Sequence, residues 1–361
     1  MEKIFIAIIE FGRTKITGVL ASKDNNSSEV AIIGIEEELS ENLIEHGVLK
    51  GSTSDISFKV KRIIEKLQGR LSQKDNTLHI SKVYVCVNDY TLSELNSSDA
   101  QAIASSTYIK KTSCEKIKKV FETINMPTVS IEPSPIATAS CVPTEAKDKN
   151  CMVVDLGADT TSVCVYQQKM LKSVVTIPFG GENITIDIQN FYNLKHDDAE
   201  KIKIERSNAI PDDVPELEDY YIQNRNNENA PIPAKELAKV TEARINEIWN
   251  NFVWKEVEDL HLEEQLDGGI YITGNASLLN GLEKYIQKQA KSDVRRIELI
   301  KFPKASIKGV AQQANISCVR KDETATATET PREHEKKAKE KKGIQFQKLF
   351  GSIENFFDTD E

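Results

Sequence analysis

Two short segments of the chain place an acidic residue at the end of an apolar run and a glycine two positions later. Glu10 and Gly12 follow the run 4–9, and Asp155 and Gly157 follow the run 151–154. Glycine lets backbone N–H groups approach an anion closely, and a carboxylate beside such a turn can hold a hydrated Mg²⁺. Because an Asp-x-Gly turn is also common hairpin chemistry, the recurrence of the turn, more than either copy, indicates a phosphate site.

The residues around each turn predict the elements that carry it. A second run with β-branched residues follows each turn, over 16–21 and 162–166, so each segment is predicted to be a β-hairpin. The two acidic residues are 145 positions apart (155 − 10). A hairpin repeated at this distance predicts two related halves that face one cleft.

The rest of the chain alternates between helical and strand patterns. Helices are expected over 56–68, 113–124 with Ser113 as the N-cap, 136–141, 196–206, 234–260 and 278–290. Short strands are expected over 78–87, 129–131 and 269–273. The segment 207–233 is rich in Asn, Asp, Glu and Pro and is predicted to be a loop or a frayed region.

Composition excludes several classes of protein. The formal net charge of −9 over 361 residues argues against general nucleic-acid binding. The six cysteines are scattered without a C-x-x-C pair, which favours small core residues of a reduced protein over metal ligands or disulfides. The apolar runs are too short for a membrane span or a secretory signal, so we expect a cytoplasmic protein.

The C-terminal part has a different composition. Residues 319–342 contain almost no large apolar side chain and are predicted to be a disordered linker. In residues 343–361, bulky apolar side chains recur at helical spacing and form one face: Phe346, Leu349, Phe350, Ile353, Phe356 and Phe357. Such a helix can lie in the headgroup region of an anionic membrane, and lysines precede it. Docking back onto the protein or into a partner groove is the alternative.

The order of the motifs resembles that of the actin-like ATPase superfamily, and their residues are similar to those of the bacterial cell-division family FtsA. The segments that carry this resemblance are DLGADTT at 155–161, IPFGGENITIDI at 177–188, DDAEKIKI at 197–204, EARINEI at 242–248 and GGIYITGNASLLNGL at 268–282. The resemblance implies a ribonuclease H-like, duplicated, bilobed α/β fold with a central nucleotide cleft.

This fold assigns a place to each part of the chain. Residues 1–150 would form the first lobe, with 88–128 as a short segment in place of the family's extra subdomain 1C. Residues 151–318 would form the second lobe, subdomains 2A and 2B. The linker and the amphipathic helix would follow.

The resemblance also assigns ATP and Mg²⁺ to the cleft. It places the metal beside Glu10 and Asp155 and gives Glu132 the role of orienting the water that attacks the γ-phosphate. The nucleotide would contact the first loop, the second loop, the Gly-Gly segment, the nucleoside helix and the adenosine turn, through Gly12, Arg13, Thr14, Lys15, Gly157, Thr160, Thr161, Gly180, Gly181, Glu200, Lys203, Gly274 and Asn275.

Four departures from the family pattern bear on activity. Glu10 stands where an Asp is usual, Arg13 where a small hydroxyl residue is usual, and Asn275 where a second glycine is usual. The fourth is the short segment 88–128. We therefore expect at most a slow ATPase. The alternative that the protein is a relative that no longer binds nucleotide also stays open.

By resemblance, the protein would tether polymers of the tubulin-like protein FtsZ to the cytoplasmic face of the cell membrane at the division site. The C-terminal tail of FtsZ would meet the second lobe within 183–265, and self-association into filaments is expected because one amphipathic helix binds weakly. The alternatives are a chaperone or sugar kinase of the same fold and an actin-like scaffold of type IV pilus machines.

Overall fold

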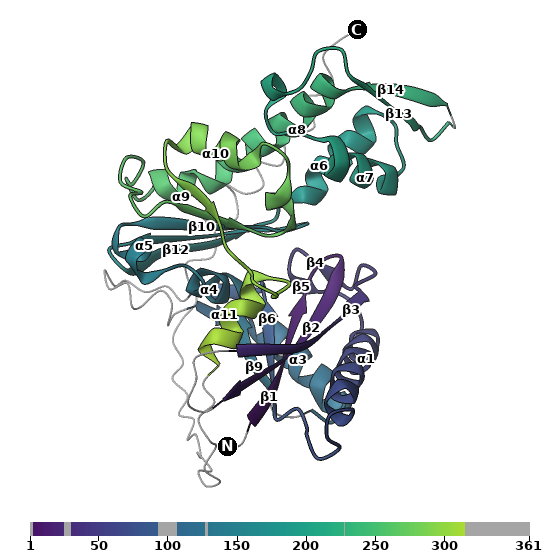
Figure 1. Ribbon diagram of the computed structural model, residues 1–361, viewed down its shortest axis with the longest axis vertical. Coiled ribbons are helices and arrows are strands. Elements are labelled where there is room, and N and C mark those ends of the chain that lie inside the picture. The colour runs from purple at the N-terminus through teal and green to yellow at the C-terminus, as the bar shows by residue number, and fades with distance from the viewer. Residues whose placement is uncertain (1–2, 25–29, 93–106, 127–128, 227, 315–361) are drawn as a thin grey trace, which may run out of the picture. The chain divides into compact units, whose positions relative to one another are not determined.

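The computed structural model describes residues 3–24, 30–92, 107–126, 129–226 and 228–314, and the larger sheets in this part of the chain are two of five strands each (Figure 1). The predicted linker 319–342 and the predicted membrane face from Phe346 to Phe357 lie outside these residues, as does Cys318. Among the helices that are described, none is both long and apolar enough to cross a membrane.

The two sheets have the same connectivity. The first has the order β3 (Val30–Leu39), β2 (Lys15–Asp24), β1 (Lys3–Phe11), β6 (Lys82–Val87) and β9 (Val129–Pro133). The second has the order β12 (Met170–Ile177), β11 (Thr161–Gln167), β10 (Cys151–Leu156), β15 (Ile270–Thr273) and β16 (Val294–Arg296). In each sheet the first strand in sequence pairs antiparallel with the second and parallel with the fourth. The predicted duplication is confirmed.

Two helices cover one face of the first sheet. Helix α1 (Thr53–Ser72) begins at Ser52, whose hydroxyl accepts the Asp55 N–H at 3.1 Å, and buries one stripe of apolar residues at helical spacing. Gly18 of β2 permits this packing, because a Cβ there would lie 2.2 Å from Ile63. Helix α3 (Lys111–Thr123) adds Ile117, Val120 and Phe121 to the same core.

Within the segment 88–128, the described part holds the strand pair β7 (Tyr90–Leu92) and β8 (Thr107–Ile109) as well as α3. The predicted N-cap is wrong: Ser113 is the third residue of α3, and its hydroxyl donates to Asp89 at 2.5 Å. A side chain that holds a neighbouring loop can therefore mimic a cap in the sequence.

The second sheet is covered by α6 (Gly181–Phe191), α7 (His196–Arg206), α8 (Ala234–Ile248) and α10 (Leu282–Ala290). The predicted helix 234–260 is interrupted: α8 passes into a π-helical turn (Trp249–Val253) and then α9 (Lys255–Glu258). The predicted helix 278–290 begins later, at Leu282, because a 3₁₀ turn, η3 (Asn275–Leu278), precedes it.

The prediction of a loop over 207–233 is wrong. A 3₁₀ turn, η1 (Pro211–Asp213), is followed by a hairpin of β13 (Asp219–Gln223) and β14 (Asn229–Pro233). This hairpin is polar on its outer side but places Ile232 in the core and Tyr220 and Ile222 against it. Its Asn and Pro residues masked this alternation in the sequence.

Helices α4 (Ser134–Ser140) and α11 (Ala305–Gln313) serve both sheets (Figure 1). Ile307 and Val310 of α11 pack with residues of β1 and β6, whereas Ala139 and Ala305 pack with residues of β10 and β11. The helices meet closely, since a Cβ on Gly309 would lie 1.8 Å from the Ala137 carbonyl oxygen. The assignment of 151–318 to a second lobe stays a prediction, although α11 within it also packs on the first sheet.

Candidate functional site: a pocket between two matching turns

The first turn links β1 to β2. The Gly12 N–H donates to the Lys15 carbonyl at 3.0 Å, and the strand register pairs Glu10 with Thr17. The Ser40 hydroxyl donates to the Gly12 carbonyl at 2.6 Å, which ties the turn to the end of β3. A Cβ on Gly12 would lie 2.8 Å from the Lys15 carbonyl oxygen, so the tight turn requires glycine.

The second turn links β10 to β11 with the same geometry. The Gly157 N–H donates to the Thr160 carbonyl at 2.8 Å, and the register pairs Asp155 with Ser162. A Cβ on Gly157 would again lie 2.8 Å from a carbonyl oxygen, that of Thr160. The two turns therefore match residue for residue, with Lys15 in the place of Thr160.

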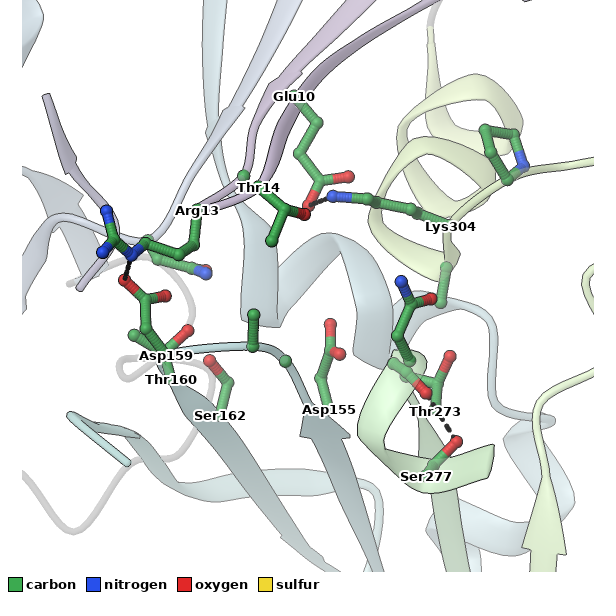
Figure 2. Close-up of a pocket in the computed structure, with 18 of the residues that line it drawn as sticks. Glu10, Arg13, Thr14, Asp155, Asp159, Thr160, Ser162, Thr273, Ser277 and Lys304 are labelled. Carbon is green, nitrogen blue, oxygen red and sulfur yellow. Dashed lines mark hydrogen bonds and ion pairs between the residues drawn. The ribbon is translucent and has the colours of Figure 1, made fainter. Parts of the chain in front are cut away.

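Both turns line one pocket of about 180 Å³, shown in Figure 2. Of the predicted site residues, the pocket brings together Glu10, Gly12, Arg13, Thr14, Asp155, Gly157, Thr160, Gly274 and Asn275. Polar residues that sequence reasoning did not select also line it: Asn88, Asp159, Ser162, Thr273, Ser277, Arg296 and Lys304.

The turn after β15 forms the third wall. Gly274 has a φ of +86°, and a Cβ there would lie 2.2 Å from the Leu156 carbonyl oxygen. Its own carbonyl accepts the N–H of Ser277 at 3.1 Å and the Ser277 hydroxyl at 2.7 Å. Asn275 opens η3 and is not among the described residues with positive φ. The turn therefore needs only one glycine, and Asn275 fits without strain.

Lys15 and Thr161 do not line the pocket. The ammonium of Lys15 is half-exposed and contacts Glu37 at 2.7 Å. The Thr161 hydroxyl is buried and donates to the Phe179 carbonyl at 2.8 Å, so this side chain supports the second turn from below. The structure therefore gives both residues roles outside the predicted contact set.

Gly180, Gly181, Glu200 and Lys203 lie behind the pocket. A Cβ on Gly180 would lie 2.5 Å from the Ala158 carbonyl oxygen, so this residue packs directly against the second turn. The buried ammonium of Lys203 donates to the Gly181 carbonyl at 3.0 Å and to Glu200 at 2.6 Å. These groups satisfy one another and hold the start of α6.

Charged groups join the two turns across the pocket. Arg13 lies 3.9 Å from the carboxylate of Asp159, which is only 10% exposed. The same carboxylate accepts the His46 N–H at 2.6 Å, from the loop between β4 (Ile44–Glu45) and β5 (Val48–Leu49). The second turn is thus contacted by two separate segments of the first half of the chain.

The comparisons with known proteins agree with this geometry. Residues 152–328 match the family Cell division protein FtsA. The FtsA of Neisseria meningitidis serogroup B is 28% identical over 186 residues, and that of Bacillus subtilis is 29% identical over 163. The chain is a divergent relative of FtsA. The aligned parts cover 49% and 45% of the chain but only 43% and 37% of these two FtsA proteins.

Solved structures extend the likeness to the described body as a whole. A PilM–PilN type IV pilus biogenesis complex matches with a TM-score of 0.60 at 12% identity, over 85% of this chain and 97% of that one. MreB5 of Spiroplasma citri bound to ADP matches with a TM-score of 0.58 at 13% identity, over 85% and 94%. The fold of the chain is therefore actin-like, as its resemblance to FtsA implies.

The residue that FtsA suggests for water activation, Glu132, lies near the pocket but not in its lining. It ends β9 and pairs in register with Cys86, which pairs with Glu10, so the three residues form a row across neighbouring strands. Strands are about 4.8 Å apart, which places Glu132 about 10 Å from Glu10 across the row. Ser130 donates to its carboxylate at 2.9 Å.

The two carboxylates that the FtsA pattern assigns to Mg²⁺ do reach the pocket. Burial, followed by the charge of Glu10, raises the pKa of Asp155 to about 6, although Lys304 and Thr138 oppose the shift. The carboxylate of Glu10 contacts the Lys304 ammonium at 3.1 Å (Figure 2). Burial alone would lower the pKa of Lys304, but Glu10 and Asp155 outweigh it and raise that pKa.

This arrangement differs from the magnesium site that an FtsA pattern predicts. Mg²⁺ binds through one or two carboxylates and its own waters, but here an ammonium of the chain already contacts Glu10. No group of three or more His, Cys, Asp and Glu suited to a metal occurs elsewhere in the residues described. Lys304 belongs to no motif that would have pointed to the site. It lies 294 positions after Glu10 in the sequence (304 − 10) and simply follows a proline.

Proposed function

We propose that the protein is an actin-like, nucleotide-binding member of the FtsA group that attaches FtsZ polymers to the cytoplasmic face of the cell membrane. One observation carries this proposal: two matching acid–x–glycine turns, on two sheets of the same order, line one pocket in a chain that resembles FtsA over 152–328. ATP is the proposed ligand, and it would act as a structural and switching ligand more than as a fuel.

The turns supply the groups that phosphates need. Backbone N–H groups next to Gly157 and the hydroxyl of Thr160 are available at the second turn, and the wall formed by Gly274 and Ser277 would hold the nucleoside. The Oδ1 atom of Asn88 is buried on the pocket wall without a hydrogen-bond partner in the described structure. A donor group of a ligand would satisfy it. These features favour a polar ligand in the pocket.

Hydrolysis would be slow. Glu132 is the proposed group that orients the attacking water, and its place about 10 Å along the sheet from Glu10 would leave room for a phosphate and a water between them. A water held by one carboxylate, without a fully assembled charge-stabilising set, gives weak catalysis of phosphoryl transfer. Slow ATP hydrolysis would therefore at most limit how long the ATP-bound state lasts.

The surface of the second half suits a peptide partner. In the part of the chain that the structure describes, ten large apolar side chains are exposed, and five of them fall within 183–265: Ile186, Phe191, Ile204, Leu217 and Tyr221. Exposed apolar groups are where a short partner segment gains most from burial. We propose that the tail of FtsZ binds within this segment, and that the apolar face from Phe346 to Phe357 binds anionic lipid.

Co-sedimentation of the full chain with anionic vesicles and FtsZ polymers tests the proposal. The variant carrying Phe350→Glu and Phe356→Glu should lose nearly all vesicle binding, because two charges would enter the apolar layer. Phe58→Glu is the matched control, since Phe58 is 63% exposed on α1. FtsZ polymers should pellet with vesicles only when the wild-type chain or the control is present.

The outcomes separate the parts of the proposal. Vesicle binding that survives the double variant would overturn the membrane role and favour a helix that docks on a partner. Vesicle binding without FtsZ recruitment would leave an actin-like scaffold with a different cargo. If the wild-type chain does not bind ATP at equilibrium, the nucleotide-binding part of the proposal is overturned. The protein would then be a tether that works without a nucleotide.

A further inference from the structure

The ammonium of Lys304 lies in the pocket beside the acid of the first turn. Lys304 directly precedes α11, and its ammonium lies 3.1 Å from one carboxylate oxygen of Glu10. Ser306, two residues later, donates its hydroxyl to the other oxygen at 3.0 Å. The start of α11 therefore holds both oxygens of the acid that ends β1.

The same ammonium reaches the phosphate turn. A Cβ built on Gly12 would lie 2.9 Å from the Lys304 Nζ atom, so the ammonium sits against the backbone of the first turn. Asp155 attracts it from the second sheet, while the nearest hydrogen-bond donor to Asp155, the Thr138 hydroxyl, is at 3.4 Å. Figure 2 shows the lysine pointing at the carboxylate of Glu10, with Asp155 on the opposite wall of the pocket.

Basic side chains of the chain offset part of the negative charge of the pocket lining. Three acidic side chains, Glu10, Asp155 and Asp159, and three basic ones, Arg13, Arg296 and Lys304, line it. Arg13 pairs with Asp159, and Arg296 contacts Glu283 at 3.1 Å outside the lining. Among the basic side chains of the lining, Lys304 is therefore the one that contacts Glu10, and its charge would repel a divalent ion placed beside that acid.

We propose that Lys304 replaces the divalent cation of this site, so that the pocket binds the phosphates of a nucleotide without Mg²⁺. This inference rests on the proposed nucleotide binding for its ligand. An ammonium has three donors, and as a compact point charge it can contact a carboxylate and a phosphate together. The site would need no metal because the ammonium of Lys304 takes the place of the ion.

The test compares ATP binding by the full chain at equilibrium in excess Mg²⁺ and in excess EDTA. The wild-type affinity should change less than about threefold between the two buffers. Lys304→Gln removes the charge and should make binding depend on Mg²⁺ by about tenfold or more, whereas Lys304→Arg should behave like the wild type. Lys308→Gln is the matched control, because Lys308 lies one turn further along α11 and outside the pocket lining.

A second measurement needs no nucleotide. Titration with Mn²⁺, followed by its electron paramagnetic resonance signal, should show no bound ion in the wild type and one in Lys304→Gln. If the wild type binds ATP only with Mg²⁺, Lys304 is an ordinary ion pair and the inference is overturned, while nucleotide binding stands. If no ATP binds in either buffer, ATP is not the ligand and the proposed nucleotide binding is overturned. The Mn²⁺ titration then decides the inference about Lys304. If Lys304→Gln binds no Mn²⁺, that inference is overturned as well.

Discussion

The two turns of the pocket share a backbone but differ in what surrounds them. In each, a glycine N–H closes the turn onto the third residue that follows, at 3.0 Å for Gly12 and 2.8 Å for Gly157. The first turn also contacts Lys304, which lies 2.9 Å from the Cβ position of Gly12. At Gly157, the three atoms nearest to the Cβ position all belong to Thr160.

This difference indicates a division of labour. The first turn is already in contact with polar groups of its own chain, because Ser40 holds Gly12, and Ser306 and Lys304 hold Glu10. The second turn presents its acid with a single weak donor and keeps Thr160 in the pocket wall. We therefore expect the second turn to supply most contacts to a ligand and the first to supply the fixed cation.

The largest expected effect comes from the turn after β15, where Gly274 packs against the second turn. Gly274→Ala would bring a methyl group to 2.2 Å from the Leu156 carbonyl oxygen and 2.5 Å from an Asp155 oxygen, at a φ of +86°. Since both the overlap and the backbone conformation are unfavourable, the free energy of unfolding should fall by at least about 3 kcal/mol. Urea unfolding followed by tryptophan fluorescence suits this, because Trp249 and Trp254 both pack in or against the second core.

Gly69→Ala is the control for this substitution. Gly69 lies exposed within α1, and nothing lies within 4 Å of its Cβ position. Alanine favours a helix over glycine by about 1 kcal/mol, so this variant should be unchanged or slightly stabilised. Equal effects of the two substitutions would contradict the claim that the turn after β15 requires glycine at position 274.

The next effect concerns the acid of the second turn. The pKa of Asp155 rises from 3.8 to about 6 on folding, because burial and Glu10 disfavour its charge. The folded state therefore binds the extra proton between these values, and stability falls as the pH rises from about 4 to about 6. Asp155→Asn should remove this loss and be more stable than the wild type at pH 7.5, relative to pH 4, by at most about 3 kcal/mol.

Unfolding midpoints of wild type and Asp155→Asn across this pH range measure the difference. It should grow through the window and then stay constant above about pH 7. A difference that does not vary with pH would show that Lys304 neutralises Asp155 more fully than we infer. The comparison of the two turns would then lose the contrast between a paired acid and a poorly paired one.

The sequence predicted the fold well because both hairpins are local. Each turn and its strands lie within about twenty residues, so the β-branched runs and the acid–x–glycine spacing are visible without tertiary information. The strand order then follows from the duplication. What the pattern missed in the fold, the hairpin of β13 and β14, is polar on one side and resembles a loop in composition.

The candidate site was only partly predictable, since its remaining groups come from distant segments. Lys304 and Asn88 reach the pocket through the placement of α11 and the end of β6, and neither carries a motif. Lys203 was expected at the nucleoside, but it is turned toward the Gly181 carbonyl because a buried ammonium must satisfy its donors. Local patterns specify turns, whereas long-range packing decides which side chains face the ligand.

The smallest effect tests the two turns at their matching positions. Thr160 is buried in the pocket wall, whereas Lys15, its equivalent, is half-exposed and paired with Glu37. A hydrogen bond to a charged group contributes about 1.5–3 kcal/mol, so Thr160→Val should weaken ATP binding about tenfold or more. Lys15→Gln should weaken it less than about twofold, because an exposed ion pair contributes little. Equilibrium dialysis with ATP measures both, and equal losses would mean that the first turn contacts the ligand as directly as the second does.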